Sequence, residues 1–217
     1  MQFINLHTHQ FTNDSSILEI VNQYPWEFDE TISTYSIGIH PWYINENRLE
    51  NDLKLIDEKL KSKECLALGE CGLDKRIEIP LEIQKEVFIK QILIAEKHQK
   101  PLILHCVAAF QEVIEIKKQL KVKVPMIIHG FSKNEQIAKQ LIDNGFYISF
   151  GKYLMQKPEL KSIFQSIPND RFFLETDTII EPLNEVYQLA ADYKNIKLTE
   201  IIETVNNNFT TVFKSNI

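Results

Sequence analysis

The chain has 217 residues, with 24 Lys and Arg against 30 Asp and Glu, and carries a net charge of −6 at pH 7. A chain of this length buries a sizeable core without disulfides or other cross-links. No apolar run approaches the roughly 18–20 residues that a transmembrane helix needs. The acidic balance argues against tight, non-specific binding of duplex DNA, which requires a basic face. It leaves open contact with a strand end or with a small phosphorylated substrate at a metal centre.

Cysteine content and the first residues both predict a cytoplasmic protein. The three cysteines are an odd number and form no disulfide framework. The first residues lack the basic region, apolar segment and cleavage site of a signal peptide. We therefore expect a cytoplasmic protein with no membrane association and no obligate protein partner.

Short apolar runs alternate along the chain with amphipathic stretches. The runs are continuous rather than alternating, which is typical of strands in a parallel sheet covered by helices. The expected strands cover residues 2–6, 34–39, 65–69, 101–105, 125–129, 146–150 and 172–175, and an eighth covers residues 17–22.

Apolar residues spaced three and four apart predict helices between these strands and after the last one. The expected helices cover residues 49–60, 81–95, 109–120, 132–144, 158–167, 182–193 and 198–213. Ser132 with Glu135 has the pattern of a capping box at a helix start, and Asn144-Gly145 has the pattern of a helix end.

Alternating strands and helices predict an α/β protein with βαβ units. We expect a (β/α)8 TIM-type barrel, as one domain over residues 1–217. The first helix should be missing or reduced to a loop, because few residues separate the first two strands. An open, doubly wound sheet is the alternative. The barrel is preferred because barrels place functional residues at the C-terminal ends of many strands, and reactive side chains follow strands along this whole chain.

His7 and His9 lie at the end of the first expected strand. Strand side chains alternate, so residues two apart point the same way. Two neighbouring imidazoles repel when both are protonated, but as neutral groups they can share a metal ion. Taken alone, such a pair is more often two surface histidines at a strand end.

Other strand ends strengthen the metal interpretation, because each carries a nitrogen or oxygen ligand. The groups at these positions are His40, Glu70, His105, His129 and Asp177. Such a set suits Zn, Mn, Fe or a similar divalent ion and needs no sulfur. Glu70 is either a carboxylate that bridges two metals or an acid in a helix N-terminus or core ion pair. Bridging is favoured because the histidines fall into an early set (His7, His9) and a late set (His105, His129), and two cations roughly 3.5–4 Å apart need a shared anion.

Six motifs occur in order along the chain. They are His7-Thr8-His9, Gly38-Ile39-His40-Pro41, Gly69-Glu70-Cys71-Gly72-Leu73-Asp74, His105 after "PLIL", His129 in "IIHGFS", and Leu174-Glu175-Thr176-Asp177. In these motifs the chain resembles the TatD family of metal-dependent hydrolases, among the amidohydrolase-like barrels, over nearly its whole length. The resemblance implies a two-metal site and hydrolysis of phosphodiester bonds in DNA, often as a 3′–5′ exonuclease.

Matched by position, the family pattern also implies individual roles. His7, His9, Glu70 and Asp177 would hold one metal, and Glu70, His105 and His129 would hold the second, with Zn, Mg or Mn as the expected ions. His40 matches a family histidine near the substrate phosphate, and its alternative role is a structural hydrogen bond beside a proline turn. Asp177, Glu70 and His40 are therefore the expected catalytic residues, and the end of a single-stranded DNA or a small phosphoester is the expected partner.

The chain departs from the family pattern at the expected substrate pocket. Val107 stands where the family commonly has an arginine, and Lys75 stands where an aromatic residue is common. A guanidinium is a natural clamp for phosphate. Lys75, Arg76 or Lys152 are candidate substitutes, although each is more often a solvated surface residue. Two alternatives therefore stay open: the same metals hydrolysing an ester, lactone or amide, or a non-catalytic protein that holds metal and binds nucleotides.

Overall fold

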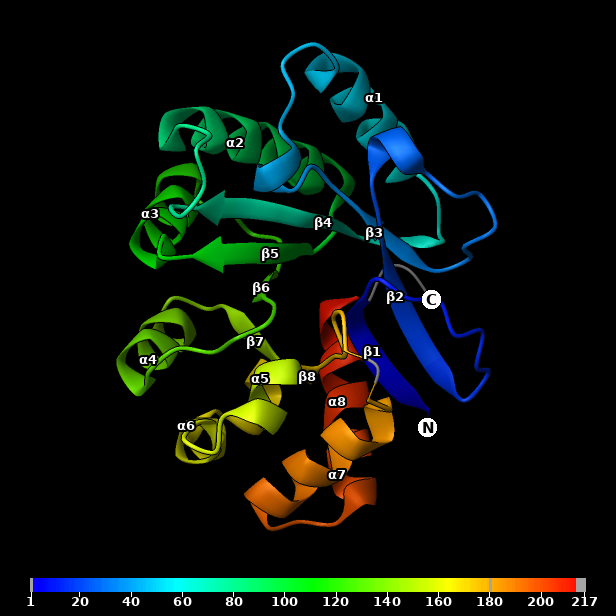
Figure 1. Cartoon of the computed structure of the whole chain (residues 1–217), viewed down its shortest axis with the longest axis vertical. Helices are drawn as coiled ribbons and strands as arrows, with labels where there is room; N and C mark the ends of the chain where they lie inside the picture. Colours follow the sequence, from blue (N-terminus) through cyan, green and yellow to red (C-terminus); the bar gives the residue numbers. More distant parts are fainter. Residues whose placement is uncertain (1, 180, 214–217) are drawn as a thin grey trace. The chain divides into compact units, whose positions relative to one another are not determined.

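A computed structural model describes residues 2–179 and 181–213 of the chain (Figure 1). Its strands are β1 (Phe3–Thr8), β2 (Ile17–Gln23), β3 (Tyr35–Ile37), β4 (Cys65–Asp74), β5 (Leu102–Val107), β6 (Met126–Ile128), β7 (Tyr147–Phe150) and β8 (Phe172–Leu174). Its α-helices are α1 (Leu49–Lys59), α2 (Leu81–His98), α3 (Phe110–Leu120), α4 (Glu135–Asp143), α5 (Lys152–Gln156), α6 (Leu160–Ser166), α7 (Leu183–Lys194) and α8 (Leu198–Val212). In the sheet the strands follow the order β1 to β8, which is the order of the predicted (β/α)8 class.

The described residues group into two compact units. The first unit contains residues 2–21 and 128–213, and the second unit contains residues 22–127. The prediction of one domain over residues 1–217 stays a prediction. Within the part of the chain that the structure describes, no helix is both long enough and apolar enough to cross a bilayer.

The second unit is built on the parallel strands β3, β4 and β5. Figure 1 shows β4 and β5 side by side, with α2 and α3 beside them. Gly72 of β4 is opposite His105 of β5, and its φ of +140° is open chiefly to glycine. A Cβ atom at Gly72 would lie 2.0 Å from the carbonyl oxygen of His105. This close approach aligns the two strands that carry Glu70 and His105.

The first unit pairs β1 with β2 and β7 with β8, both in parallel. Its core is aromatic: Phe150, Phe164 and Phe172 pack edge to face with centroids 5.0 Å apart in each successive pair. Tyr187 of α7 is fully buried, and its hydroxyl bonds both the N–H and the carbonyl of Ile4 in β1. These contacts anchor the strand that carries His7.

All eight predicted strands are present, with ends that differ by a few residues. The predicted loss of the first helix is confirmed, since residues 9–16 connect β1 to β2 without a helix. The connection from β2 to β3 carries only a 3-10 turn at Pro25–Glu27.

Two helix predictions need correction. The capping box at Ser132 is wrong: α4 begins at Glu135, and its N-cap is Asn134, whose side chain accepts from Ile137 N–H at 3.0 Å. The short helix α5 (Lys152–Gln156) was not predicted, because five residues are too few to show a helical apolar period.

Candidate metal centre

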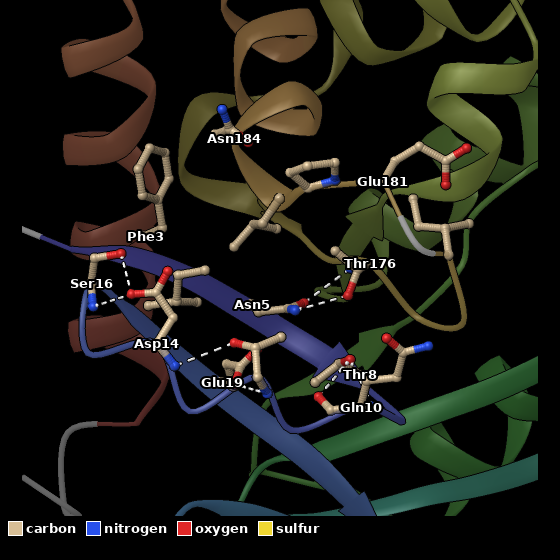
Figure 2. Close-up of a pocket in the computed structure, with 15 residues that line it drawn as sticks. Phe3, Asn5, Thr8, Gln10, Asp14, Ser16, Glu19, Thr176, Glu181 and Asn184 are labelled. Atoms are coloured by element: carbon tan, nitrogen blue, oxygen red, sulfur yellow. Dashed lines mark hydrogen bonds between the residues drawn. The ribbon is translucent and has the colours of Figure 1, made fainter.

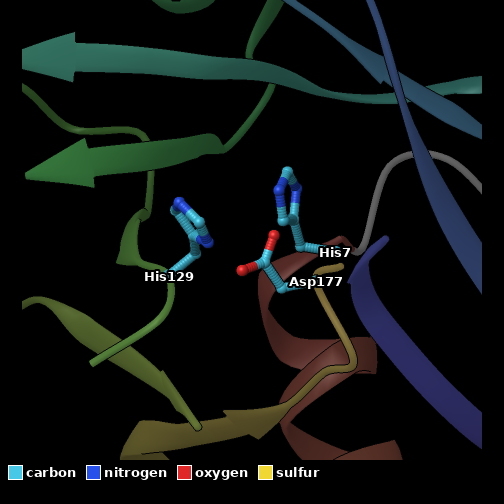
Figure 3. Close-up of side chains that lie close together, drawn as sticks. All are labelled: His7, His129 and Asp177. Atoms are coloured by element: carbon cyan, nitrogen blue, oxygen red, sulfur yellow. The ribbon is translucent and has the colours of Figure 1, made fainter. Parts of the chain in front are cut away.

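Three potential ligands from distant parts of the sequence meet in the first unit: His7, His129 and Asp177 (Figure 3). One ligand atom from each lies within 4.8 Å of the others. His7 belongs to β1, His129 directly follows β6, and Asp177 lies three residues beyond β8. The strand-end positions that the sequence predicts therefore bring these side chains together.

Asp177 is held next to β1 by hydrogen bonds on both sides of it. Its N–H donates to the carbonyl of His7 at 3.0 Å, and its carbonyl accepts from His9 N–H at 3.1 Å. One residue earlier, Thr176 exchanges two hydrogen bonds with the buried Asn5 side chain. Asp177 has φ of +56°, an uncommon conformation that this surrounding pairing maintains.

His9 lies at the exposed rim of this cluster. Its ring centroid is 5.1 Å from that of His7, and its Nε2 atom is 3.7 Å from Asp177 Oδ1. The alternation of the strand thus places both imidazoles near one carboxylate, as the sequence predicts.

Glu175 lies behind His129 and is a polar residue of the site that the sequence prediction missed. Its side chain is 0% exposed. Its Oε1 atom accepts from Gly130 N–H at 2.7 Å and lies 3.4 Å from His129 Nδ1. Burial alone would raise the pKa of Glu175, but hydrogen bonding to His129 and electrostatic attraction to the neighbouring imidazoles outweigh burial and hold that pKa below its usual value. A carboxylate behind a histidine is the arrangement that orients metal-ligating imidazoles.

A second cluster of potential ligands lies in the second unit and consists of His40, Glu70 and His105. Glu70 is buried, and its N–H donates to Asn22 Oδ1 at 2.8 Å. Its Oε1 atom lies 3.0 Å from His105 Nδ1 and 3.2 Å from His40 Nε2. Glu70 lies within β4, so it is not an acid at a helix N-terminus. Its role as a metal-bridging carboxylate and its role in a core ion pair both stay predictions.

The proton of neutral His40 is assigned by its neighbours. His40 is the N-cap of the 3-10 turn Pro41–Tyr43, and its Nδ1 accepts from Trp42 N–H at 3.1 Å. A neutral imidazole that accepts at Nδ1 carries its proton on Nε2, the atom that faces Glu70. His40 is therefore suited to donate a hydrogen bond rather than to coordinate a metal. The hydrogen bond beside the proline turn, one of the two expected roles, is present, and the role near the substrate phosphate stays a prediction.

Asp74 supports His105 from the other side and was also missed as a site residue. Its Oδ2 atom lies 3.2 Å from His105 Nε2 and accepts from the Trp42 indole N–H at 2.8 Å. Burial opposes ionisation, yet hydrogen bonds from Trp42, Arg76 N–H and His105 outweigh it and lower the pKa of Asp74. Asp74 could have been found from the motif Gly69-Glu70-Cys71-Gly72-Leu73-Asp74. Residues four apart on a strand point to the same face, so Asp74 is expected on the face of Glu70.

The donor chemistry of the two clusters fits divalent cations. The buried imidazole of His7 has its centroid 4.4 Å from that of His129, so two protonated rings would repel strongly. Neutral imidazoles with a carboxylate form a nitrogen and oxygen set typical of Zn and similar ions. The predictions that Glu70 shares one metal with His7, His9 and Asp177, and a second metal with His105 and His129, join residues of both units and stay predictions.

A cavity of about 590 Å³ in the first unit contains none of the predicted ligands (Figure 2). It is lined in part by Asn5, Thr8, Glu19 and Thr176. Glu19 accepts from the N–H and hydroxyl of Thr12, and Asn5 pairs with Thr176. These polar groups bond one another, and they brace β1 behind His7 where the first helix of the barrel is missing.

Of the candidate substitutes for a phosphate clamp, Lys75 forms an ion pair with Glu112, and Lys152 lies near the Tyr153 ring. Lys75 is therefore engaged with an acid of its own unit, consistent with a surface role.

The chain was compared with known proteins. The profile of the family described as "TatD related DNase" matches residues 2–214. The uncharacterized metal-dependent hydrolase YabD of Bacillus subtilis is 36% identical over 146 residues, which are 65% of this chain and 57% of that protein. The uncharacterized metal-dependent hydrolase YcfH of Escherichia coli K12 is 28% identical over 197 residues, 82% of this chain and 73% of that protein. The chain thus spans less than two thirds of the Bacillus protein.

Two solved structures show the same fold. YjjV, a TatD homologue from Escherichia coli K12, has a TM-score of 0.83 at 20% identity and covers 98% of each chain. A TatD family hydrolase from Entamoeba histolytica has a TM-score of 0.82 at 17% identity, over 98% of each chain. The predicted fold class is confirmed by these likenesses, and the family profile over residues 2–214 shows that the chain belongs to the TatD-related DNase family.

Proposed function

We propose that the chain is a metal-dependent hydrolase that cleaves phosphodiester bonds at the end of single-stranded DNA, with two divalent ions (Zn, Mg or Mn). The observation that carries the proposal is the pair of ligand clusters, one in each unit: His7, His129 and Asp177 in the first, and Glu70 with His105 in the second, where His40 lies beside them as a hydrogen-bond donor. The relatives YabD and YcfH are described as metal-dependent hydrolases, which supports the same class.

His7, His9, His129 and Asp177 would hold metal in the first unit, and Glu70 with His105 in the second. When bound, divalent ions supply Lewis acidity that activates water and offsets charge on phosphoryl oxygens. The chain's own residues then have separate tasks. Glu175 and Asp74 orient His129 and His105 through the contacts described above.

Asp177 is the proposed proton acceptor. Its carboxylate is partly exposed, so that water can reach it, and its backbone is held on both sides by β1. A carboxylate fixed in this way can orient a water molecule and take its proton during attack. His40 is the proposed donor to the substrate: its Nε2–H can turn its hydrogen bond from Glu70 to a phosphoryl oxygen as negative charge develops.

The test begins with metal content, measured by mass spectrometry on protein purified without added metal. Single-stranded oligonucleotides with either the 3′ or the 5′ end blocked are then incubated with the protein, with and without chelator. We expect bound divalent metal, cleavage abolished by chelator, and protection by one blocked end only. Protein without metal and without metal-stimulated cleavage contradicts the proposal.

Variants assign the roles. Asp177→Ala and Glu70→Ala should lose cleavage by at least about 100-fold, as expected for an acid or base in the transition state, while their circular dichroism is unchanged. Asp170→Ala and Glu78→Ala are matched controls, because both are exposed carboxylates of the same two units. Full activity in Asp177→Ala or Glu70→Ala contradicts the mechanism.

A second candidate reaction is hydrolysis of a carboxylic ester or lactone at the same metals. The observations that favour it are Val107, which stands where the family commonly has an arginine, and the ion pair of Lys75 with Glu112. Parallel turnover of a phosphodiester and a lactone panel decides between the two. Preference for a lactone by kcat/KM rejects phosphodiester hydrolysis, and metal-loaded protein that binds strands but turns over neither substrate supports the non-catalytic alternative.

A further inference from the structure

A continuous row of aromatic rings lies in the second unit and ends at the candidate site. We call Tyr24, Trp26, Trp42 and Tyr43 the aromatic ridge. Tyr24 stacks on Trp26 at 4.9 Å between centroids, and Tyr43 meets both rings edge to face. The Tyr43 ring lies 5.7 Å from the His40 ring, and Trp42 meets the rings of His40 and His105 at 5.0 and 5.8 Å, so that His40 connects Trp42 to the other three rings.

The two rings of the aromatic ridge that lie beside His40 are exposed to an extent that is unusual for such large side chains. Trp42 is 53% exposed and Tyr43 is 44% exposed. An exposed cluster of large apolar groups often marks a binding site. Here the exposed rings are next to the imidazoles of His40 and His105, so a molecule bound on them would also reach the candidate metal ligands.

The exposed rings are held in place rather than mobile on a loop. Trp42 donates its indole N–H to the buried Asp74 at 2.8 Å. Arg48 donates to the carbonyl of Tyr43 at 2.6 Å, and its guanidinium lies 3.8 Å from the centroid of Trp26. A rigid aromatic surface loses little conformational entropy when a ligand binds.

The net charge of the chain indicates that an aromatic surface would bind a strand by stacking rather than by electrostatic attraction. The protein carries a net charge of −6, and Lys75 is paired with Glu112. A polyanionic strand therefore gains little from general electrostatic attraction. Affinity for a strand must come from the metal ligands and from contacts that do not depend on phosphate charge, and stacking of bases on aromatic rings is such a contact.

We propose that Trp42 and Tyr43 are a stacking platform for the unpaired bases of a single strand, next to the phosphate that is cleaved. This inference rests on the proposed function and adds the recognition element to it. Because every base has a π face, the platform accepts any sequence. Bases inside a duplex have their faces covered by neighbours, so paired DNA is a poor ligand.

Binding without turnover tests the platform separately from catalysis. The fluorescence anisotropy of labelled dT6 and of an abasic sugar-phosphate hexamer is measured with metal-free protein in chelator, at 50 and 200 mM salt. One stacked base corresponds to about 5- to 150-fold in affinity. We expect dT6 to bind at least about 5-fold more tightly than the abasic strand, with nearly the same ratio at both salt concentrations.

Three variants separate stacking from the hydrogen bond to Asp74. Trp42→Ala removes both, and the preference for dT6 over the abasic strand should fall to about 1. Trp42→Phe keeps a ring but loses the N–H donor, and it should keep most of the preference. Leu93→Ala removes an equally exposed apolar side chain (55%) that belongs to α2 and not to the aromatic ridge, and this variant should behave as wild type.

Equal binding of dT6 and the abasic strand by wild type overturns the inference. The inference is also overturned if Trp42→Ala keeps the full preference for dT6, or if it lowers the affinity for dT6 and for the abasic strand by the same factor. Either result assigns Trp42 a structural role through its hydrogen bond to Asp74. Failure of the proposed function has a different signature: base-dependent binding persists in chelator, while metal-loaded protein cleaves no strand.

Discussion

Replacing Glu175 with Gln removes one negative charge behind His129 while keeping the shape of the side chain. The carboxylate is fully buried, accepts from Gly130 N–H at 2.7 Å, and lies 3.4 Å from His129 Nδ1. The amide can still accept from Gly130, so the backbone turn after β6 is preserved. What changes is the strength with which the side chain orients and polarises the imidazole.

The expected size follows from the hydrogen bonds. A bond to a charged group contributes about 1.5–3 kcal/mol and a neutral one about 0.5–1.5. The difference of roughly 1–2 kcal/mol corresponds to about 5- to 30-fold weaker metal binding, at the lower end of the 10–100-fold range for residues behind metal ligands. Competition titration of metal-free protein against a chromophoric chelator at pH 7 measures this change directly.

The matched control is Glu159→Gln, an exposed glutamate of the same unit, which should leave metal affinity unchanged. Calorimetric melting separates the metal effect from packing: Glu175→Gln should lower Tm more for the metal-loaded protein than for the metal-free one. A metal Kd within twofold of wild type, or an equal loss of Tm in both forms, refutes the role assigned to Glu175.

Three further results are expected. Gly72→Ala should destabilise the fold by more than about 3 kcal/mol or prevent folding, because a Cβ would lie 2.0 Å from the His105 carbonyl oxygen. Gly130→Ala is the control: its Cβ would lie 3.9 Å from Glu175 Oε1, and its φ of +57° should cost only about 1 kcal/mol. Urea unfolding measures both changes. Burial lowers the pKa of Lys194 to about 8. Between pH 8 and about 10 the Lys194 side chain is protonated in the unfolded chain but not in the folded chain, so the free energy of unfolding should increase with pH. Relative to Lys194→Met, this increase should be about 1–2 kcal/mol once solvent screening is allowed for. A decrease over the same pH range contradicts the lowered pKa. Chelation of metal held at about 1,000 times its Kd should lower Tm by roughly 8–16 °C, and an unchanged Tm contradicts specific binding to the folded state.

Much of the fold is predictable from local pattern. The strands read from apolar runs are all present, because a strand covered by helices needs apolar side chains on both faces. The loop that replaces the first helix was predictable from spacing alone, since residues 9–16 are too few for a crossover helix. The start of α4 was predicted wrongly because Ser132 and Asn134 are both good N-cap residues, and only the backbone path decides between them.

The predicted site residues fall into the two clusters, but their supporting groups do not follow from local sequence. Glu175 and Asp74 are themselves part of the motifs, yet their partners His129 and His105 are 46 and 31 positions away. The aromatic ridge was not predicted at all, because Trp26 and Trp42 look like ordinary apolar residues until their exposure and neighbours are known.

The sequence by itself determined the family, the order of strands and helices, and the set of potential ligands, because these depend on residue type and spacing within short segments. Only the tertiary structure decided how these ligands are used. The turn at Pro41–Tyr43 puts the proton of neutral His40 on Nε2, and the end of β1 holds Asp177 at a positive φ beside His7. Both outcomes depend on hydrogen bonds and packing in three dimensions, and residue spacing carries no information about the atoms that a side chain meets across the sheet.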